Sequence, residues 1–123
     1  MAIKRLSDTV AATVNTTGSA TTTVILSYTI PTDYVGVLYA RIAGRTASTG
    51  AIPAAVGIMG CFVKNVSGTV TVADSGNILS PGAVTYTMDF NVSGTAVRVR
   101  VTDAGSSLSN DWFCVLESTL TSA

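Results

Sequence analysis

The 123-residue sequence contains no histidine, which is the most common general base and metal ligand of proteins. A Ser-His-Asp or Cys-His catalytic arrangement is therefore impossible, and two cysteines alone do not complete a typical zinc site. No phosphate-binding glycine loop is present. The seven carboxylates fall mostly at expected strand ends, and no pair of them stands out as a hydrolytic pair. We therefore expect no enzyme and no cofactor.

Charge is also scarce, because only 11% of the residues are charged and the formal net charge is zero. Hydroxyl groups replace the missing charges, with 19 threonines and 13 serines. A neutral chain has no electrostatic reason to bind nucleic acid or an anionic membrane. A surface with so few charged side chains gives a monomer little protection against association. We expect part of the apolar surface to be covered by another copy or another protein.

Long hydrophobic runs are missing as well. The longest apolar stretch, residues 51–63, contains proline and glycine and is shorter than the ~20 residues that a membrane-spanning helix needs. The segment MAIKRLSDTV at the start has a basic pair without an apolar run behind it, so it is not a secretory signal. We expect synthesis in the cytosol and no membrane partner.

The sequence has two cysteines, Cys61 and Cys114, and each lies in an apolar, strand-like run. One interpretation is a disulfide between neighbouring strands. The other is a pair of buried thiols that act as small hydrophobic residues. We favour buried thiols, because a domain with a full core needs no such cross-link.

Strand-like patterns cover almost the whole chain. Residues 84–92 alternate apolar and polar side chains, residues 97–102 do the same, and residues 21–30 are rich in β-branched side chains and stop at Pro31. No stretch has a convincing helical period. We predict an all-β, single-domain antiparallel β-sandwich or jelly roll of about eight strands. Residues 1–12 are expected to form an extended N-terminal arm, and residues 13–123 the sandwich.

The pentapeptide NVSGT occurs twice, at residues 65–69 and 91–95, and each copy separates two strand-like runs. Asparagine and glycine tolerate the positive φ angles of tight hairpins, so both copies are predicted to be hairpin tips. Both copies, and NTT at 15–17, also match the N-glycosylation pattern. Turn chemistry explains the repeat better, because chance matches are frequent in a chain this rich in serine and threonine.

Several residues are candidates for binding. The start of the arm carries a basic pair between two apolar residues and is a candidate docking segment for a partner: Ile3, Lys4, Arg5 and Leu6. Arg98 and Arg100 share one strand face and form either a partner contact or an exposed face that resists edge pairing. Trp112 is expected in the core rather than in a ligand site. The segment DAGSSLSND at 103–111 lacks the regular oxygen spacing of a calcium loop.

The second half of the chain resembles β-rich structural domains of tailed bacteriophage virions. The resemblance covers residues 57–119 and rests on three segments in order: GCFVKNVSGTVTVAD, VTYTMDFNVSGTAVRVRVTDAG and NDWFCVLEST. Its fixed positions correspond here to Gly68, Gly94 and Trp112. The pattern carries no catalytic signature.

The resemblance implies a virion component that forms homotrimers. The favoured expectation is a capsid decoration (cement) protein on the capsid surface, bound to the major capsid protein, because the sequence shows no shaft or coiled coil. The alternative is a tail-fibre protein, adhesin or carbohydrate-binding module that contacts the host surface. Exposed aromatic side chains would serve a sugar site, and Tyr34 and Tyr39 are the candidates for it.

Overall fold

The computed structural model describes residues 4–16, 22–46, 55–79, 86–102 and 109–122, and every regular element in these ranges is a β-strand. The strands are β1 (Arg5–Thr16), β2 (Thr22–Thr29), β3 (Tyr34–Thr46), β4 (Ala55–Val66), β5 (Thr69–Leu79), β6 (Thr87–Ser93), β7 (Ala96–Thr102) and β8 (Asn110–Ser122).

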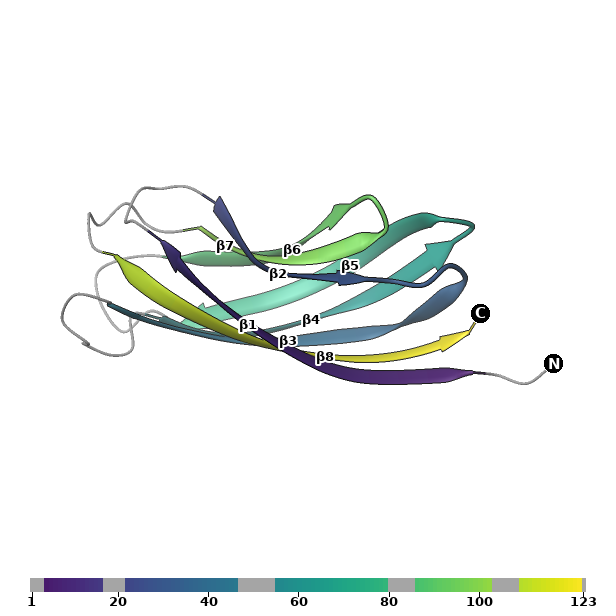
Figure 1. Ribbon diagram of the computed structural model, residues 1–123, viewed down its shortest axis with the longest axis horizontal. Helices are drawn as coiled ribbons and strands as arrows, with labels where there is room; N and C mark the ends of the chain where they lie inside the picture. Colours follow the sequence, from purple (N-terminus) through teal and green to yellow (C-terminus); the bar gives the residue numbers. More distant parts are fainter. Residues whose placement is uncertain (1–3, 17–21, 47–54, 80–85, 103–108, 123) are drawn as a thin grey trace.

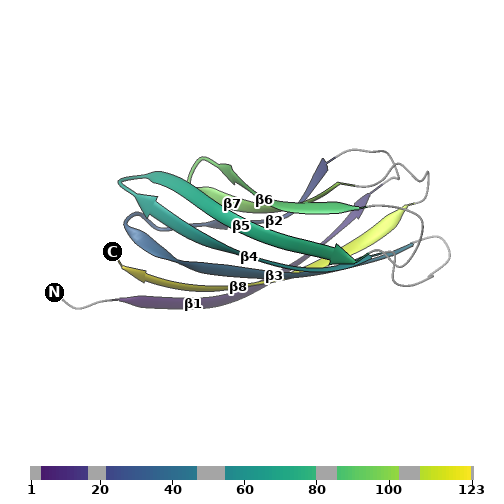
Figure 2. The same cartoon turned by 180° about the vertical axis from the view of Figure 1, so that it is seen from behind.

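The strands form two antiparallel sheets that face each other (Figures 1 and 2). The larger sheet has the order β1-β8-β3-β4-β5, and the smaller has the order β2-β7-β6. Contacts of β5 with β6 and of β1 with β2 connect the two sheets along their edges. The predicted all-β sandwich of about eight strands is confirmed. The jelly-roll topology stays a prediction, since the strands divide five and three.

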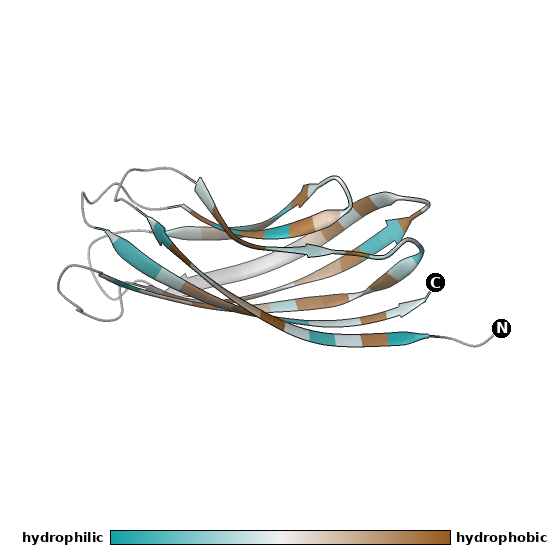
Figure 3. Ribbon diagram, viewed as in Figure 1, coloured by the Kyte–Doolittle hydropathy of each residue, from teal (hydrophilic) through white to brown (hydrophobic). Residues whose placement is uncertain are grey.

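Alternation along the strands builds the core between the sheets. In β7 every second residue is fully buried, and the alternating bands of hydropathy are visible along the strands in Figure 3. A β-bulge between Val24 and Leu26 shifts the register of β2 against β7. The largest buried apolar side chains come from both sheets: Ile30, Leu38, Met59, Val97, Val99, Val101, Trp112, Leu116 and Leu120.

Trp112 organises one end of this core. Its indole N–H donates to the Thr16 hydroxyl at 3.0 Å, and its ring meets the Tyr86 ring edge-on with the centroids 5.2 Å apart. Gly44 lies directly opposite on β3 and leaves room for the indole. The prediction that Trp112 belongs to the core is confirmed, because its side chain is fully buried and hydrogen-bonded.

Both NVSGT copies are hairpin tips, as predicted, but they turn at different positions. The first turn is Ser67–Gly68, and both residues have positive φ (53° and 89°). The second turn is one position later, at Gly94–Thr95, where Gly94 has φ 60°. Identical residues therefore face different ways in the two hairpins, because side chains alternate along a strand.

Asn65 shows the consequence of this shift. It is fully buried, its amide nitrogen donates to the Ile30 carbonyl at 2.8 Å, and its side-chain oxygen accepts from the Gly68 N–H at 2.9 Å. Asn91, the equivalent residue of the second copy, is half-buried and accepts from Arg98 Nε at 2.6 Å. Both asparagines serve the fold, which supports the interpretation of NVSGT as a turn.

The expected N-terminal arm differs from what the structure shows for its described part. Arg5 begins β1, and residues 5–12 are paired with β8 because their alternating pattern continues that of the sheet. The two ends of the described chain meet here: the Ser122 N–H donates to the Lys4 carbonyl at 2.8 Å, and the Lys4 N–H donates to the Ser122 hydroxyl at 2.9 Å. Figure 1 shows both termini at the same end of the sandwich.

Cys61 and Cys114 are buried thiols that form no disulfide, as the favoured interpretation predicted. They lie on the inner face of the larger sheet, in β4 and β8, with β3 between them. Burial raises the pKa of Cys114 to about 11. In the part of the chain that the structure describes, there is no helix of the length and apolar character that crossing a membrane requires.

Candidate functional site

The outer face of the larger sheet carries most of the exposed large apolar side chains. Four of them lie side by side on β3 and β4 and form what we call the apolar band: Val37, Tyr39, Ile58 and Phe62. Their exposed fractions are 42%, 52%, 52% and 73%. Large apolar side chains gathered on one face of a sheet mark an interaction surface rather than ordinary surface scatter.

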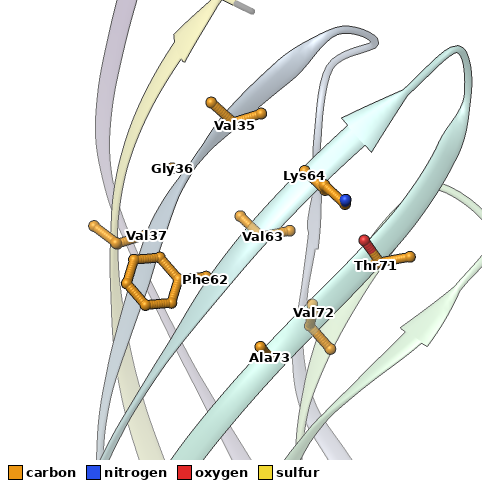
Figure 4. Close-up of a pocket in the computed structure, with 9 residues that line it drawn as sticks. All are labelled: Val35, Gly36, Val37, Phe62, Val63, Lys64, Thr71, Val72 and Ala73. Atoms are coloured by element: carbon orange, nitrogen blue, oxygen red, sulfur yellow. The ribbon is translucent and has the colours of Figure 1, made fainter.

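The centre of the apolar band is the pair Val37 and Phe62, which are direct partners across β3 and β4. Figure 4 shows their side chains next to each other. Phe62 is also opposite Ala73 on β5, whose small side chain leaves one side of the ring open. Val37, Phe62 and Ala73 line an open depression of about 480 Å³. Lys64 and Thr71 form its polar border.

A second feature occupies the opposite end of the same outer face. Three polar residues on adjacent strands lie in one line across the sheet, and we call them the polar row: Asn15 on β1, Asp111 on β8 and Arg45 on β3. The amide nitrogen of Asn15 donates to Asp111 Oδ1 at 3.0 Å, and Arg45 Nε lies 3.6 Å from Asp111 Oδ2. The central carboxylate is therefore held from both sides.

Phe113 lies two residues from Asp111 and points to the same outer face. Its direct partners are Thr13 on β1 and Ala43 on β3, both small residues, and 48% of its surface is exposed. Together with the polar row and these small neighbours it lines an open depression of about 720 Å³. An exposed aromatic ring beside a few convergent polar groups is a combination found in small-molecule sites.

The two arginines singled out in the sequence lie on β7, in the smaller sheet. Arg100 forms a two-pronged pair with Asp89, with distances of 2.9 Å and 2.6 Å, and the hydrogen bond to Asp89 raises the pKa of Arg100. Arg98 donates to Asn91. Both arginines thus have partners on the neighbouring strand β6. A partner-binding role for them stays a prediction.

The proposed docking segment lies only partly within the described residues. Ile3 is outside them, Lys4 directly precedes β1, and Arg5 and Leu6 are its first residues; all three described residues are exposed. They lie beside the C-terminal end of β8 and far along the sheet from the polar row. Tyr34 lies at the same end of the sheet, opposite Ser122 of β8, to which Lys4 is hydrogen-bonded. Docking through this segment stays a prediction.

The two tyrosines proposed for a sugar site have different surroundings. Tyr39 is exposed and belongs to the apolar band, whereas Tyr34 is partly buried against the core. Sequence reasoning missed the site around Phe113. Asn15 and Asp111 are 96 positions apart, and only the pairing of β1 with β8 places them together. The sequence did contain one indication of this site, since alternation of side chains along a strand places Asp111 and Phe113 on the same face.

No group of three or more metal-ligating side chains occurs among the residues that the structure describes. Residues 103–108, which make up most of the segment weighed as a calcium loop, lie outside the described ranges.

Comparison with known proteins yields similarity of fold without similarity of sequence. No protein family matches the chain, and no curated protein does. The tailspike protein of Acinetobacter baumannii phage AM24 is 13% identical with a TM-score of 0.50, over 98% of this chain and 26% of that chain. Tailspike gp49 of Acinetobacter baumannii bacteriophage Fri1, a capsular polysaccharide depolymerase, is 14% identical with a TM-score of 0.51. The match covers 98% of this chain and 21% of that chain.

The chain thus spans about a quarter or less of the length of these two proteins. The Fri1 protein also corrects the expectation that the chain belongs to no enzyme, because this fold occurs within a depolymerase. The expectation was wrong in its reasoning: missing histidine and missing motifs in one domain say nothing about the activity of a larger protein that contains such a domain.

Proposed function

We propose that this chain is a domain of a phage tailspike or tail fibre, a virion protein that contacts the surface of the host cell. The observation that carries the proposal is the likeness of fold to two tailspike proteins along 98% of the chain. That likeness favours the tail alternative over capsid decoration. It agrees with the resemblance of residues 57–119 to structural domains of phage virions.

The architecture suits such a role. Two sheets with a continuous apolar core form a rigid body, and the outer face of the larger sheet remains available for contacts. That face separates two kinds of surface, the apolar band on β3 and β4 and the polar row with Phe113 at the other end. One domain can therefore bind a protein partner through the apolar band and a ligand through the polar row at the same time.

For the apolar band we propose a second copy of this chain as the partner. Arg41 and Glu117 lie beside the band and pair at 2.6 Å, so these two charges cancel, and Lys64 is the remaining charge among the described residues at its border. A face that is mainly apolar can pack on its own copy, as two sheets pack face to face through such side chains. The scarcity of charge in the whole chain, 11%, has the same explanation. The trimeric state and the major capsid protein as partner stay predictions.

The experiment that tests the tail assignment is a count of this chain in purified particles by quantitative mass spectrometry, combined with immunogold electron microscopy. A tail component is expected at a small fraction of the copies of the major capsid protein, with gold at the tail. Copy numbers comparable with the capsid protein, with gold over the shell, would establish the decoration role instead. Absence from particles would refute any virion role.

A further inference from the structure

We infer that the polar row and Phe113 form a binding site for a neutral saccharide. The site is built from three adjacent strands, β1, β8 and β3, so the sheet itself fixes its geometry. Sites on strands are held more accurately than sites on loops. The inference deepens the proposed function and rests on it for the source of the saccharide, the surface of a host cell.

Phe113 supplies the apolar half of the site. A sugar ring has one face of C–H groups that packs on an aromatic ring, and such packing requires that the ring be open to solvent. Thr13 and Ala43, its cross-strand partners, are too short to cover the ring, and 48% of Phe113 is exposed. A bulky partner on either strand would have closed it.

The polar row supplies the hydrogen bonds. Asp111 accepts from Asn15 through Oδ1 and faces Arg45 through Oδ2, so its carboxylate is oriented before any ligand arrives. Each carboxylate oxygen can accept further bonds, and Arg45 has more N–H groups than this contact uses. Sugar hydroxyls both donate and accept. They therefore match a row in which acceptors and donors alternate.

The charge of the site selects the class of ligand. Among the nine described residues that line the depression, Arg45 is the one cation and Asp111 the one anion, and the two neutralise each other. A phosphate or nucleic acid would find no net positive charge there, because Asp111 offsets Arg45. One carboxylate is too few for a divalent cation, which takes six or more oxygen ligands. A neutral, hydroxyl-rich ligand remains.

The core beneath the site keeps it in shape. Trp112 lies between Asp111 and Phe113 in sequence and points inward, where it is fixed by Thr16 and by Tyr86. The backbone of β8 is therefore anchored at the position where its outward side chains form the site. The anchored backbone keeps Asp111 and Phe113 in register with their partners on β1 and β3.

The test is an NMR titration of the isotope-labelled chain with methyl glycosides of glucose, galactose, mannose and N-acetylglucosamine. Changes in the chemical shifts of the chain measure binding. At least one glycoside is expected to bind saturably, with a dissociation constant on the order of millimolar. Phe113→Ala and Asp111→Asn should each weaken this binding by roughly fivefold or more. Val66→Ala, which shortens an exposed apolar side chain on the same face, outside both the site and the apolar band, is the matched control and should leave it unchanged.

Circular dichroism and urea unfolding of each variant establish that it is folded. Absence of saturable binding for every glycoside overturns the inference, and so does binding that survives both site variants or is lost in Val66→Ala. Tighter binding of methyl glucuronide than of every neutral glycoside would overturn the neutral class. These results are independent of the particle count, so failure of the saccharide site and failure of the tail assignment are distinguishable.

Discussion

Gly44 and Trp112 face each other across β3 and β8, and the indole ring occupies the space that a side chain on Gly44 would need. A Cβ atom at position 44 would lie 2.5 Å from Cζ3 of the indole and 2.6 Å from Cε3. The indole has little freedom to retreat, because its N–H is bound to Thr16 and its ring contacts Tyr86. The smallest residue at position 44 is thus the condition for burying the largest one at position 112.

Gly44→Ala is therefore expected to lower the free energy of unfolding by about 1–3 kcal/mol, as overpacking does in other cores. Urea denaturation measures this change. Gly60→Ala is the control, because a Cβ there meets its nearest atom, Cδ2 of Tyr39, at 3.4 Å, an ordinary contact. Equal destabilisation by both substitutions would contradict the special role of Gly44.

The two asparagines of the repeated pentapeptide should respond differently to truncation. Asn65→Ala leaves the buried Ile30 carbonyl and the Gly68 N–H without their partner, at a cost of about 1–3 kcal/mol in unfolding free energy. Asn91→Ala removes one half-buried bond to Arg98 and should cost less than about 1 kcal/mol. Thermal or urea unfolding of the two variants side by side makes the comparison. A larger loss of unfolding free energy for Asn91→Ala than for Asn65→Ala would refute the different structural roles given to the two asparagines.

The buried thiol of Cys114 predicts a loss of stability in alkali. Its pKa is raised from 9.0 to about 11 by burial, so the folded chain keeps the proton that the unfolded chain releases. The stabilisation is fully present below pH 9 and is lost as the pH rises toward 11, by about 2 kcal/mol.

Unfolding free energies of the wild type and of Cys114→Ala, measured from pH 8 to 11, test this prediction. The difference between the two should shrink with rising pH, since groups common to both proteins cancel. Parallel curves would mean that the thiol does not titrate differently in the folded and unfolded chains.

Self-association through the apolar band should disappear when a charge is placed at its centre. Phe62→Asp is expected to shift the chain to monomer in light scattering coupled to gel filtration, because a carboxylate cannot be buried there without a partner. Val66→Asp, at an exposed residue next to the hairpin turn and outside the band, is the matched control. A wild-type chain that is monomeric at every concentration would refute the proposal.

The fold was predictable because alternation of side chains is a local property. The strands β6 (Thr87–Ser93) and β7 (Ala96–Thr102) and both NVSGT tips follow from nearest neighbours in sequence. The one-residue offset between the two tips did not follow, since it depends on the burial of Asn65 against Ile30, a contact over 35 positions.

The candidate site was less predictable for a related reason. Arg45 and Asp111 are adjacent only because β3 and β8 pair, and strand order within a sheet is decided by the whole core. Local patterns identify the outward positions of each strand. They do not say which strands are neighbours, so exposed side chains from three strands could not be assembled into one site.

The hydrogen bonds between Lys4 and Ser122 hold the two ends of the described chain next to each other, which makes the sandwich suitable for insertion into another protein. A polypeptide enters and leaves the domain at almost the same point, so grafting it into a surface loop of an unrelated host protein should need only a short connector on each side. The same closeness allows the two ends to be joined and the chain to be reopened at a hairpin such as Ser67–Gly68. The sandwich could then be transferred to other proteins with the outer face of its larger sheet exposed.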